Sequence, residues 1–227
     1  ITFDFYLTLI HPRGEKGRGG LYVDFLAQHG LQAAPWEHSV LYDVFKYYEE
    51  EYDPGSAPSA KLQFWNRFTL RLFDRTELLG DHAALARTHA ATIRDIFGPN
   101  QFGVYPEVID VLRDLNDRDI PLAVVSNWQA GLAKFCQELG IRDHFACIIA
   151  SAEVGHEKPD AAIFAEAGRR LAVPASDILH VGDSPDDDLE GAAAAGLTSV
   201  LIDRDCRSEA VNGQVIHDLR QIINLIE

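Results

Sequence analysis

The stretch Ile178-Leu179-His180-Val181-Gly182-Asp183 is a short apolar run that ends on an aspartate. The beginning of the chain, Ile1-Thr2-Phe3-Asp4, has the same arrangement. Short apolar runs that end in a turn are typical of buried strands in a parallel sheet, and open α/β sheets bind ligands at the carboxyl ends of such strands. We therefore expect Asp4 and Asp183 to lie at the same edge of one sheet.

Two further polar residues occupy comparable positions. Ser126 ends the apolar run 120–125, and Lys158 lies just before a segment with helical spacing. With Asp4 and Asp183, these residues form a candidate site of two carboxylates, a hydroxyl and an ammonium group.

From residue 106 onward, segments with helical and strand-like patterns alternate. This alternation predicts an α/β fold with a parallel sheet and right-handed crossovers. The strand that precedes Asp4 must join this sheet, because an isolated buried strand cannot satisfy its backbone hydrogen bonds. The expected helices cover 107–118, 130–139, 161–171, 189–195 and a last one from 219, and the expected strands cover 120–125, 145–149, 178–181 and 198–202.

Residues 21–98 have helical apolar spacing throughout and predict a helical insert. A cluster of turn-forming residues at 52–59 should divide the insert, and the glycine-rich segment 11–20 should form a loop before it. The chain is thus expected to fold as a core of residues 1–10 and 101–227 with an inserted domain of residues 11–100. The core of the insert is expected to be aromatic, from Tyr42, Phe45, Tyr47, Tyr48, Tyr52, Phe64, Trp65 and Phe68.

The composition limits the kind of partner. A formal net charge of −15 argues against nucleic acid, whose phosphates require a basic surface. No run approaches the ~18 apolar residues of a membrane span, and the first residues lack the profile of a secretion signal. Cys136, Cys147 and Cys206 are odd in number and are expected to be packed thiols. We expect a cytoplasmic protein with a small-molecule substrate, of undetermined oligomeric state.

Four segments, taken together, resemble the four motifs of the haloacid dehalogenase superfamily, in the same order. They are Phe3-Asp4-Phe5-Tyr6-Leu7-Thr8-Leu9, Val124-Val125-Ser126-Asn127, Glu157-Lys158-Pro159-Asp160, and residues 181–192 around Gly182-Asp183-Ser184. The helical insert is similar to the alpha-helical cap of the subfamily I members. The resemblance implies a Rossmann-like parallel sheet core with an inserted helical cap.

The chemistry of the residue types agrees with this resemblance. A carboxylate, here Asp4, can attack phosphorus or carbon to form a covalent intermediate. The hydroxyl of Ser126 and the ammonium group of Lys158 are suited to hold the oxygens of a bound anion. Asp183 and Asp188 supply hard oxygen ligands of the kind that Mg²⁺ prefers. Two like charges about 4 Å apart repel by about 4 kcal/mol at an effective dielectric constant near 20, which favours a bound divalent cation or raised carboxyl pKa values.

The resemblance assigns further roles. It makes Asp4 the nucleophile, with Tyr6, Ser126 and Lys158 as the other catalytic residues. It implies substrate contacts from Thr8, Ser126, Asn127 and Lys158, and a Mg²⁺ site formed by Asp4, Asp183, Asp188 and the backbone carbonyl of Tyr6.

Most of these residues also have a purely structural interpretation. Asp186 and Asp187 are typical of a helix cap or a turn, and we leave both out of the site. Ser126 and Asn127 can equally cap a helix, and most lysines are solvated. The histidines lack metal-ligand spacing, so His144, His156 and His180 are expected to pack or to be solvated.

Tyr6 and Leu7 depart from the superfamily's pattern. Phosphatases of the superfamily carry a second aspartate where this chain has Tyr6, and a phenol with a pKa near 10 rarely acts as a base. Glycine is customary at Leu7. The 2-haloacid dehalogenases of the superfamily do carry tyrosine at the position of Tyr6, but they work without metal and lack the acid pair that Asp183 and Asp188 form.

Three functions remain open from the sequence. The favoured one is a Mg²⁺-dependent phosphohydrolase of a small phosphorylated metabolite. The alternatives are a 2-haloacid dehalogenase-like hydrolase and a non-catalytic member that binds a phosphorylated ligand or a protein.

Overall fold

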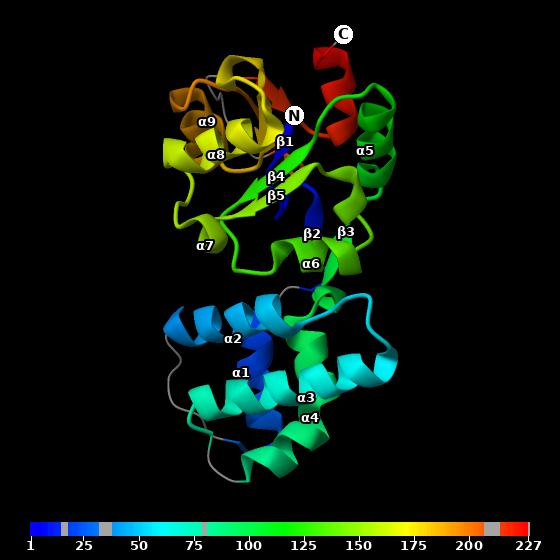
Figure 1. The fold of residues 1–227 in the computed structure, drawn as a ribbon, viewed down its shortest axis with the longest axis vertical. Coiled ribbons are helices and arrows are strands. Elements are labelled where there is room, and N and C mark those ends of the chain that lie inside the picture. Colours follow the sequence, from blue (N-terminus) through cyan, green and yellow to red (C-terminus); the bar gives the residue numbers. More distant parts are fainter. Residues whose placement is uncertain (15–17, 32–37, 79–80, 207–213, 227) are drawn as a thin grey trace. The chain divides into compact units, whose positions relative to one another are not determined.

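The structure, a computed structural model, describes residues 1–14, 18–31, 38–78, 81–206 and 214–226. The chain divides into two compact units, each formed from separate segments of the sequence (Figure 1). The first, which we call the sheet unit, comprises Ile1–His11, Val104–Trp128 and Gly140–Glu227. The second, the helical unit, comprises Pro12–Gly103 and Gln129–Leu139.

A six-stranded sheet with the order β5-β4-β1-β6-β7-β8 forms the centre of the sheet unit. Every described pairing within it is parallel, which confirms the predicted α/β fold. In Figure 1, α8 and α9 lie on one side of the strands and α5 on the other. The strands are β1 Thr2–Phe3, β4 Ala123–Ser126, β5 Cys147–Ala150, β6 Leu179–Gly182, β7 Thr198–Ile202 and β8 Gln214–Ile216. The α-helices are α5 Val108–Asp117, α7 Ser151–Val154, α8 Ala161–Leu171 and α9 Gly191–Ala194.

β1 lies in the middle of the sheet although it is the first strand in sequence order. Phe3 pairs with Val124 of β4 on one side and with Val181 of β6 on the other. The chain adds β4 and β5 on the first side and then crosses over to add β6, β7 and β8 on the second. Ligands of open α/β sheets bind where the strand order reverses in this way, which places the expected site at the carboxyl ends of β1 and β6.

The helical unit contains α1 Arg18–Gln28, α2 His38–Glu51, α3 Pro58–Arg75, α4 His82–Phe97 and α6 Leu132–Glu138. The predicted break at 52–59 separates α2 from α3, where Asp53 accepts hydrogen bonds from the Gly55 backbone and the Ser56 hydroxyl. Six of the eight aromatic residues expected in the core are buried: Phe45, Tyr48, Tyr52, Phe64, Trp65 and Phe68. Tyr47 is only partly buried against them, and the side chain of Tyr42 lies outside the described part.

The division into units differs from the expected one, mainly at residues 129–139. The helix α6 was expected in the core, but it groups with the helical unit. Contacts within that unit explain the difference, because Glu138 pairs with Lys61 at 2.8 Å and Phe135 packs edge-on against Phe102. Residues 101–103 also group with the helical unit, and residue 11 with the sheet unit.

Several local predictions were wrong. Residues 11–20 are not one loop: β2 (Ile10–Pro12) pairs with β3 (Phe102–Val104), and α1 begins at Arg18. Residues 15–17 lie outside the described part. Strands of three residues are too short to show a period, and the glycines at the start of α1 suggested a turn.

The carboxyl-terminal part of the chain also departs from expectation. The helix expected over 189–195 is a π-type turn, Pro185–Glu190, followed by α9, and the last helix, Leu219–Leu225, is of the 3-10 type. Three further 3-10 turns are Pro99–Gln101, Arg142–His144 and Ala175–Asp177. None of the three cysteines, all within the described residues, forms a disulfide; Cys136 is buried, Cys147 is half-buried and Cys206 is exposed.

Among the described residues, none of the helices combines the length and the apolar character that crossing a membrane requires.

Candidate active site

Three carboxylates meet where β1 and β6 end. Asp4 follows β1 directly, Asp183 follows β6 directly, and Asp188 lies in the π-type turn after β6. One oxygen from each of the three lies within 4.8 Å of the others. Asp4 and Asp188 are buried, and Asp183 is half-buried. Asp4 and Asp183, which the sequence analysis placed at the same edge of the sheet, therefore lie close together in space.

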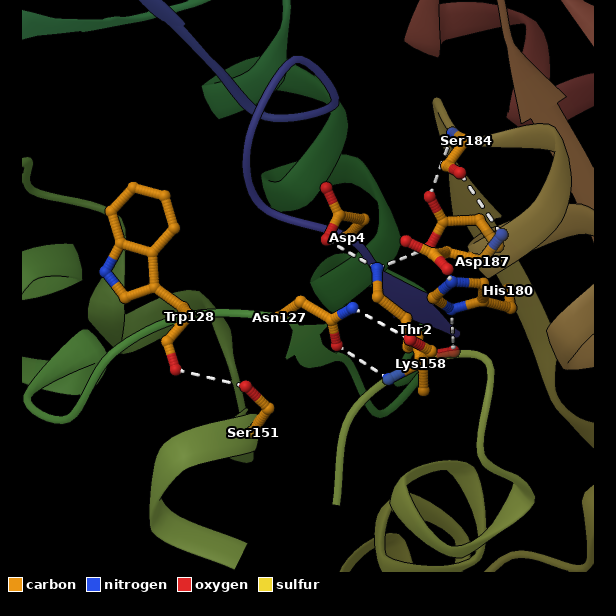
Figure 2. A network of polar contacts seen from close by, with 10 residues as sticks. Thr2, Asp4, Asn127, Trp128, Ser151, Lys158, His180, Ser184 and Asp187 are labelled. Atoms are coloured by element: carbon orange, nitrogen blue, oxygen red, sulfur yellow. Dashed lines mark hydrogen bonds and ion pairs between the residues drawn. The ribbon is translucent and has the colours of Figure 1, made fainter. Parts of the chain in front are cut away.

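Lys158 lies between Asp4 and Asp188, and its ion pair with Asp4 can be followed in Figure 2. Its ammonium group donates to Oδ1 of Asp4 at 2.6 Å and to Oδ1 of Asp188 at 2.5 Å, and its side chain is 3% exposed. Because two carboxylates surround one buried ammonium group, Lys158 is a structural part of the acidic cluster, in contrast to a solvated surface lysine.

Asn127 holds the backbone of Lys158 in place. Its side-chain amide donates to the Lys158 carbonyl at 2.9 Å and accepts from the Lys158 backbone N–H at 2.6 Å. The sequence analysis assigned Asn127 to substrate binding. In the structure this amide positions the backbone of Lys158, which lies 31 positions further along the chain.

Asp188 is oriented by three donors besides its place on the turn. Oδ2 accepts from the Ser184 backbone N–H at 3.0 Å, and Oδ1 accepts from His180 as well as from Lys158. A carboxylate offers about four lone-pair sites, so about one remains for a further ligand. The carboxylate lies over Gly182, where a Cβ atom would overlap it. Glycine at 182 is therefore required for Asp188 to reach this position.

His180 is a member of the cluster that the sequence analysis missed. It is fully buried; Nε2 lies 3.0 Å from Oδ1 of Asp188, and Nδ1 lies 2.9 Å from the hydroxyl oxygen of Thr2 (Figure 2). Side chains two residues apart in a strand share one face, so His180 lies beside Gly182, and Thr2 is its cross-strand partner. If the Thr2 hydroxyl donates to Nδ1, the Nε2–H of a neutral ring points at Asp188. The strand period predicts that His180 and Gly182 share a face, but it does not predict that the Asp188 carboxylate lies over that face.

Burial and charge shift the pKa values of the cluster in different directions. Burial raises the pKa of Asp4, which Lys158 only partly offsets. Burial also raises the pKa of Asp188, but the hydrogen bond from His180 and the charge of Lys158 outweigh it and hold that pKa below its usual range. For Lys158, burial lowers the pKa, yet the two carboxylates outweigh this effect and the pKa lies above its ordinary value. The ammonium group therefore stays charged.

Asp183 gives the metal-free protein a pH dependence. Burial, with the charges of Asp4 and Asp188, raises the pKa of Asp183 from 3.8 to about 7. The folded state then holds this proton more tightly than the unfolded chain, so its stabilising contribution is complete below about pH 4 and is lost as the pH rises through about 7. With chelator present, we expect the Tm to fall by a few degrees between pH 5 and 8, since about 1–2 kcal/mol remains after screening of this partly exposed group.

Thermal unfolding measured with EDTA and with MgCl₂ across this pH range tests the expectation. Mg²⁺ should remove most of the decline, because a bound cation replaces the proton as the neutralising charge. The D183N variant provides the control and should lack this part of the decline. A chelated wild type with the same pH profile as D183N would contradict the assignment.

The remaining predicted site residues lie around this cluster with different exposure. Ser126 ends β4 and is buried, whereas Tyr6 is 37% exposed. The Tyr6 ring lies 6.4 Å from the ring of Trp128, which also packs edge-on against Phe5 at 5.2 Å. Trp128 was not predicted, because a single aromatic residue after a strand carries no pattern. Thr8, assigned to substrate binding, is fully buried, and its hydroxyl has no hydrogen-bond partner among the described residues.

Leu7 adopts the backbone conformation that glycine would supply. Its φ of 59° lies in the left-handed region, which costs a leucine about 1–2 kcal/mol. The turn is closed by hydrogen bonds from Leu7 N–H to the Ile10 carbonyl at 2.8 Å and from Leu9 N–H to the Phe5 carbonyl at 3.0 Å. The turn after Asp4 therefore forms despite the departure from the superfamily's pattern.

The donor set fits a hard divalent cation. Three carboxylates against one ammonium group leave a charge of about −2 when all are ionised, and Mg²⁺ is typically bound through one or two carboxylates with substrate phosphate and water. The structure is thus that of an α/β protein with a helical insertion and a carboxylate cluster at the carboxyl ends of its parallel strands, where ligands of such sheets bind.

Comparison with known proteins gives the family. The haloacid dehalogenase-like hydrolase family matches residues 1–196 of this chain. The chain therefore belongs to the haloacid dehalogenase-like hydrolases, and the resemblance inferred from its four motifs is confirmed.

Similar proteins include both phosphatases and dehalogenases. The human "Haloacid dehalogenase-like hydrolase domain-containing protein 3" is 31% identical over 205 residues, covering 88% of this chain and 78% of that protein. A "Glyceraldehyde 3-phosphate phosphatase" of Methanopyrus kandleri is 40% identical over 104 residues, covering 44% of this chain and 43% of that protein. The crystal structure of a 2-haloacid dehalogenase from Pseudomonas syringae pv. Tomato DC3000 is 27% identical, with a TM-score of 0.62 over 99% of this chain and 96% of that one.

Proposed function

We propose that this protein is a Mg²⁺-dependent phosphohydrolase that acts on a small phosphorylated metabolite through an aspartyl-phosphate intermediate. The observation that carries the proposal is the convergence of Asp4, Asp183 and Asp188 within 4.8 Å, with Lys158 bonded to two of them. Such a cluster combines a nucleophile, a cation site and a fixed positive charge. Phosphatase names among similar proteins support this choice of reaction.

In this mechanism Asp4 is the nucleophile. A carboxylate oxygen of Asp4 attacks phosphorus while the bond to the leaving oxygen breaks, the leaving oxygen takes a proton from solvent water, and the phosphoryl group becomes attached to Asp4. Lys158 holds the other Asp4 oxygen and contributes positive charge beside the transferred group. Ser126, at the end of β4, donates its hydroxyl to a phosphoryl oxygen. Water then attacks phosphorus, releases phosphate and restores Asp4.

Asp4, Asp183 and the backbone carbonyl of Tyr6 would hold the proposed cation, and the remaining lone pair of Asp188 could add a further contact. Bound there, Mg²⁺ would neutralise the developing charge on the phosphoryl oxygens. His180 and Ser184 act on this site indirectly, because they fix the orientation of Asp188.

A specific observation favours a second candidate. Tyr6 stands where phosphatases of the superfamily carry an acid, and halide needs no proton when it leaves, which fits a 2-haloacid dehalogenase. The similarity to the dehalogenase from Pseudomonas syringae pv. Tomato DC3000 points the same way.

One experiment separates the candidates. The purified protein is assayed on a panel of phosphate esters and of 2-halo acids, with Mg²⁺ and after treatment with EDTA. The proposal predicts phosphate release that requires Mg²⁺. Halide release by the EDTA-treated protein would establish the dehalogenase instead, and binding of a phosphate analogue without turnover of either panel would indicate a non-catalytic member.

Tyr6→Asp is expected to raise the rate of hydrolysis of para-nitrophenyl phosphate by about 10-fold or more, since a positioned acid or base typically contributes a factor of 10²–10⁴. The new carboxyl group would protonate the leaving oxygen and then activate water. The measurement is the steady-state rate of nitrophenol release.

Tyr6→Asn is the matched control, because it removes the same ring contact with Trp128 and introduces no acid. Its rate should not rise above that of the wild type. An equal rise in both variants would show that removal of the tyrosine ring, and not the added acid, is responsible.

A further inference from the structure

Arg204 lies just after β7 and contacts the turn that follows Asp4. One terminal nitrogen donates to the Thr8 carbonyl oxygen at 2.6 Å. The other donates to Oε1 of Glu107 at 2.6 Å, and the guanidinium carbon lies over the Tyr105 ring, 3.5 Å from its centre. All four residues belong to the sheet unit, and the Arg204 side chain is only 13% exposed. Three different segments of the chain thus meet at one half-buried guanidinium group.

The turn that Arg204 contacts, Phe5–Ile10, contains an unfavourable backbone conformation. Leu7 has a φ of 59°, a conformation that is unfavourable for a leucine. The hydrogen bonds within the turn accept on the Phe5 and Ile10 carbonyls and do not use the carbonyl of Thr8. Arg204 supplies the donor for that carbonyl, and Tyr105 adds a second tie through its backbone N–H, which donates to the Leu9 carbonyl at 3.1 Å.

The geometry requires an arginine. A guanidinium group is planar, remains charged and presents donors in a fixed fork, so it can bond two acceptors and stack on a ring at once. A lysine has a single ammonium group and can preserve the ion pair with Glu107. It cannot also donate to the Thr8 carbonyl from a planar group that lies over the Tyr105 ring. Arg204 is therefore matched to its three partners by shape as well as by charge.

We propose that Arg204 is a positioning residue that holds the turn Phe5–Ile10 in its unfavourable conformation, and thereby keeps the backbone carbonyl of Tyr6 in place. This inference rests on the proposed function, which gives the Tyr6 carbonyl a role in holding Mg²⁺. Arg204 itself does not touch the reacting atoms; it acts through the turn.

Arg204→Lys tests the proposal, with Arg220→Lys as the matched control. Arg220 makes a two-pronged ion pair with Asp218 in the same unit, but its side chain is 72% exposed. The first measurement is hydrogen exchange of the backbone amides of Leu7, Leu9 and Ile10. We expect exchange at least about 10-fold faster in R204K and unchanged in R220K. Wild-type protection in folded R204K would overturn the proposal.

The second measurement connects the turn to the site. R204K should bind Mg²⁺ about 10-fold more weakly, as is typical when a residue that orients a metal ligand is lost, and should lose about 10- to 100-fold in kcat/KM for para-nitrophenyl phosphate. R220K should match the wild type in both. Faster exchange without any change in Mg²⁺ binding would show that the turn does not carry a metal ligand and would reject the positioning role.

A double variant tests the proposal in case R204K does not fold. Removing one partner of a buried ion pair leaves the other charge uncompensated, whereas Arg204→Met combined with Glu107→Gln removes both charges. It should show the same faster exchange at Leu7, Leu9 and Ile10, and wild-type protection would again overturn the proposal. Failure of the proposed function is distinguishable, because a wild type without Mg²⁺-dependent turnover would leave the exchange result standing.

Discussion

Asparagine in place of Asp4 is expected to abolish turnover, lowering kcat by at least about 10,000-fold, as happens when a catalytic nucleophile is removed. The amide keeps the shape of the carboxylate but cannot form the phosphorylated intermediate. Folding should survive, because the amide oxygen can still accept the hydrogen bond from Lys158, whose charge remains paired with Asp188. The measurements are the rate of phosphate release and the Tm of the same preparation.

Asp186→Asn is the matched control for D4N. Asp186 belongs to the same acidic run but is exposed, and it is not a member of the three-carboxylate group. D186N should therefore retain the wild-type rate. Mass spectrometry of D4N after incubation with substrate should also show no phosphorylated protein. Full activity in D4N would reject the assignment of Asp4 as nucleophile, whatever the behaviour of the control.

Methionine in place of Lys158 is expected to damage both stability and catalysis. The variant leaves Asp4 and Asp188 buried without the ammonium group that now bonds to both, and breaking a buried ion pair in this way costs about 3–5 kcal/mol. Turnover should fall by about 10²–10³-fold, since a fixed charge beside the phosphoryl group is lost. Chemical unfolding in EDTA measures the first effect, and phosphate release with saturating Mg²⁺ measures the second.

The surface ion pair between Lys61 and Glu138 supplies the control. It has a comparable N–O distance of 2.8 Å, but its side chains are 30% and 25% exposed, so K61M should cost no more than about 1 kcal/mol. Mg²⁺ should restore part of the stability of K158M, about 2.7 kcal/mol at 100 times its Kd, because the cation binds the same carboxylates. A loss in K158M as small as that in K61M would mean that the buried pair does not balance the acidic cluster.

The sequence predicts the main features of the fold because they depend on local patterns. The strand ends at Asp4 and Asp183 are marked by apolar runs, and the parallel sheet follows from the alternation of elements. Residues 161–171 and 198–202 form the helix α8 and the strand β7 with the predicted bounds. The aromatic core of the helical unit follows in the same way from helical spacing.

The features that were missed depend on contacts that local sequence patterns do not predict. His180 meets Asp188 only because the π-type turn brings the carboxylate back over Gly182, and Arg204 meets Thr8 across 196 positions. The grouping of α6 with the helical unit rests likewise on the contact of Glu138 with Lys61, 77 positions away. Local sequence patterns do not predict such contacts, so His180 and Arg204 could be recognised as positioning residues only from the structure.

The central place of β1 has a consequence for how the protein is made. Its two sheet neighbours are synthesised about 120 and 180 residues after it. The helices α3 and α4, by contrast, are consecutive in the sequence and pack against each other. Contacts between distant positions form slowly, and local helical contacts form early. On the ribosome, we expect the first strand to wait unpaired while the insertion acquires its helices, and catalytic competence to appear only once residues beyond Asp188 have left the exit tunnel.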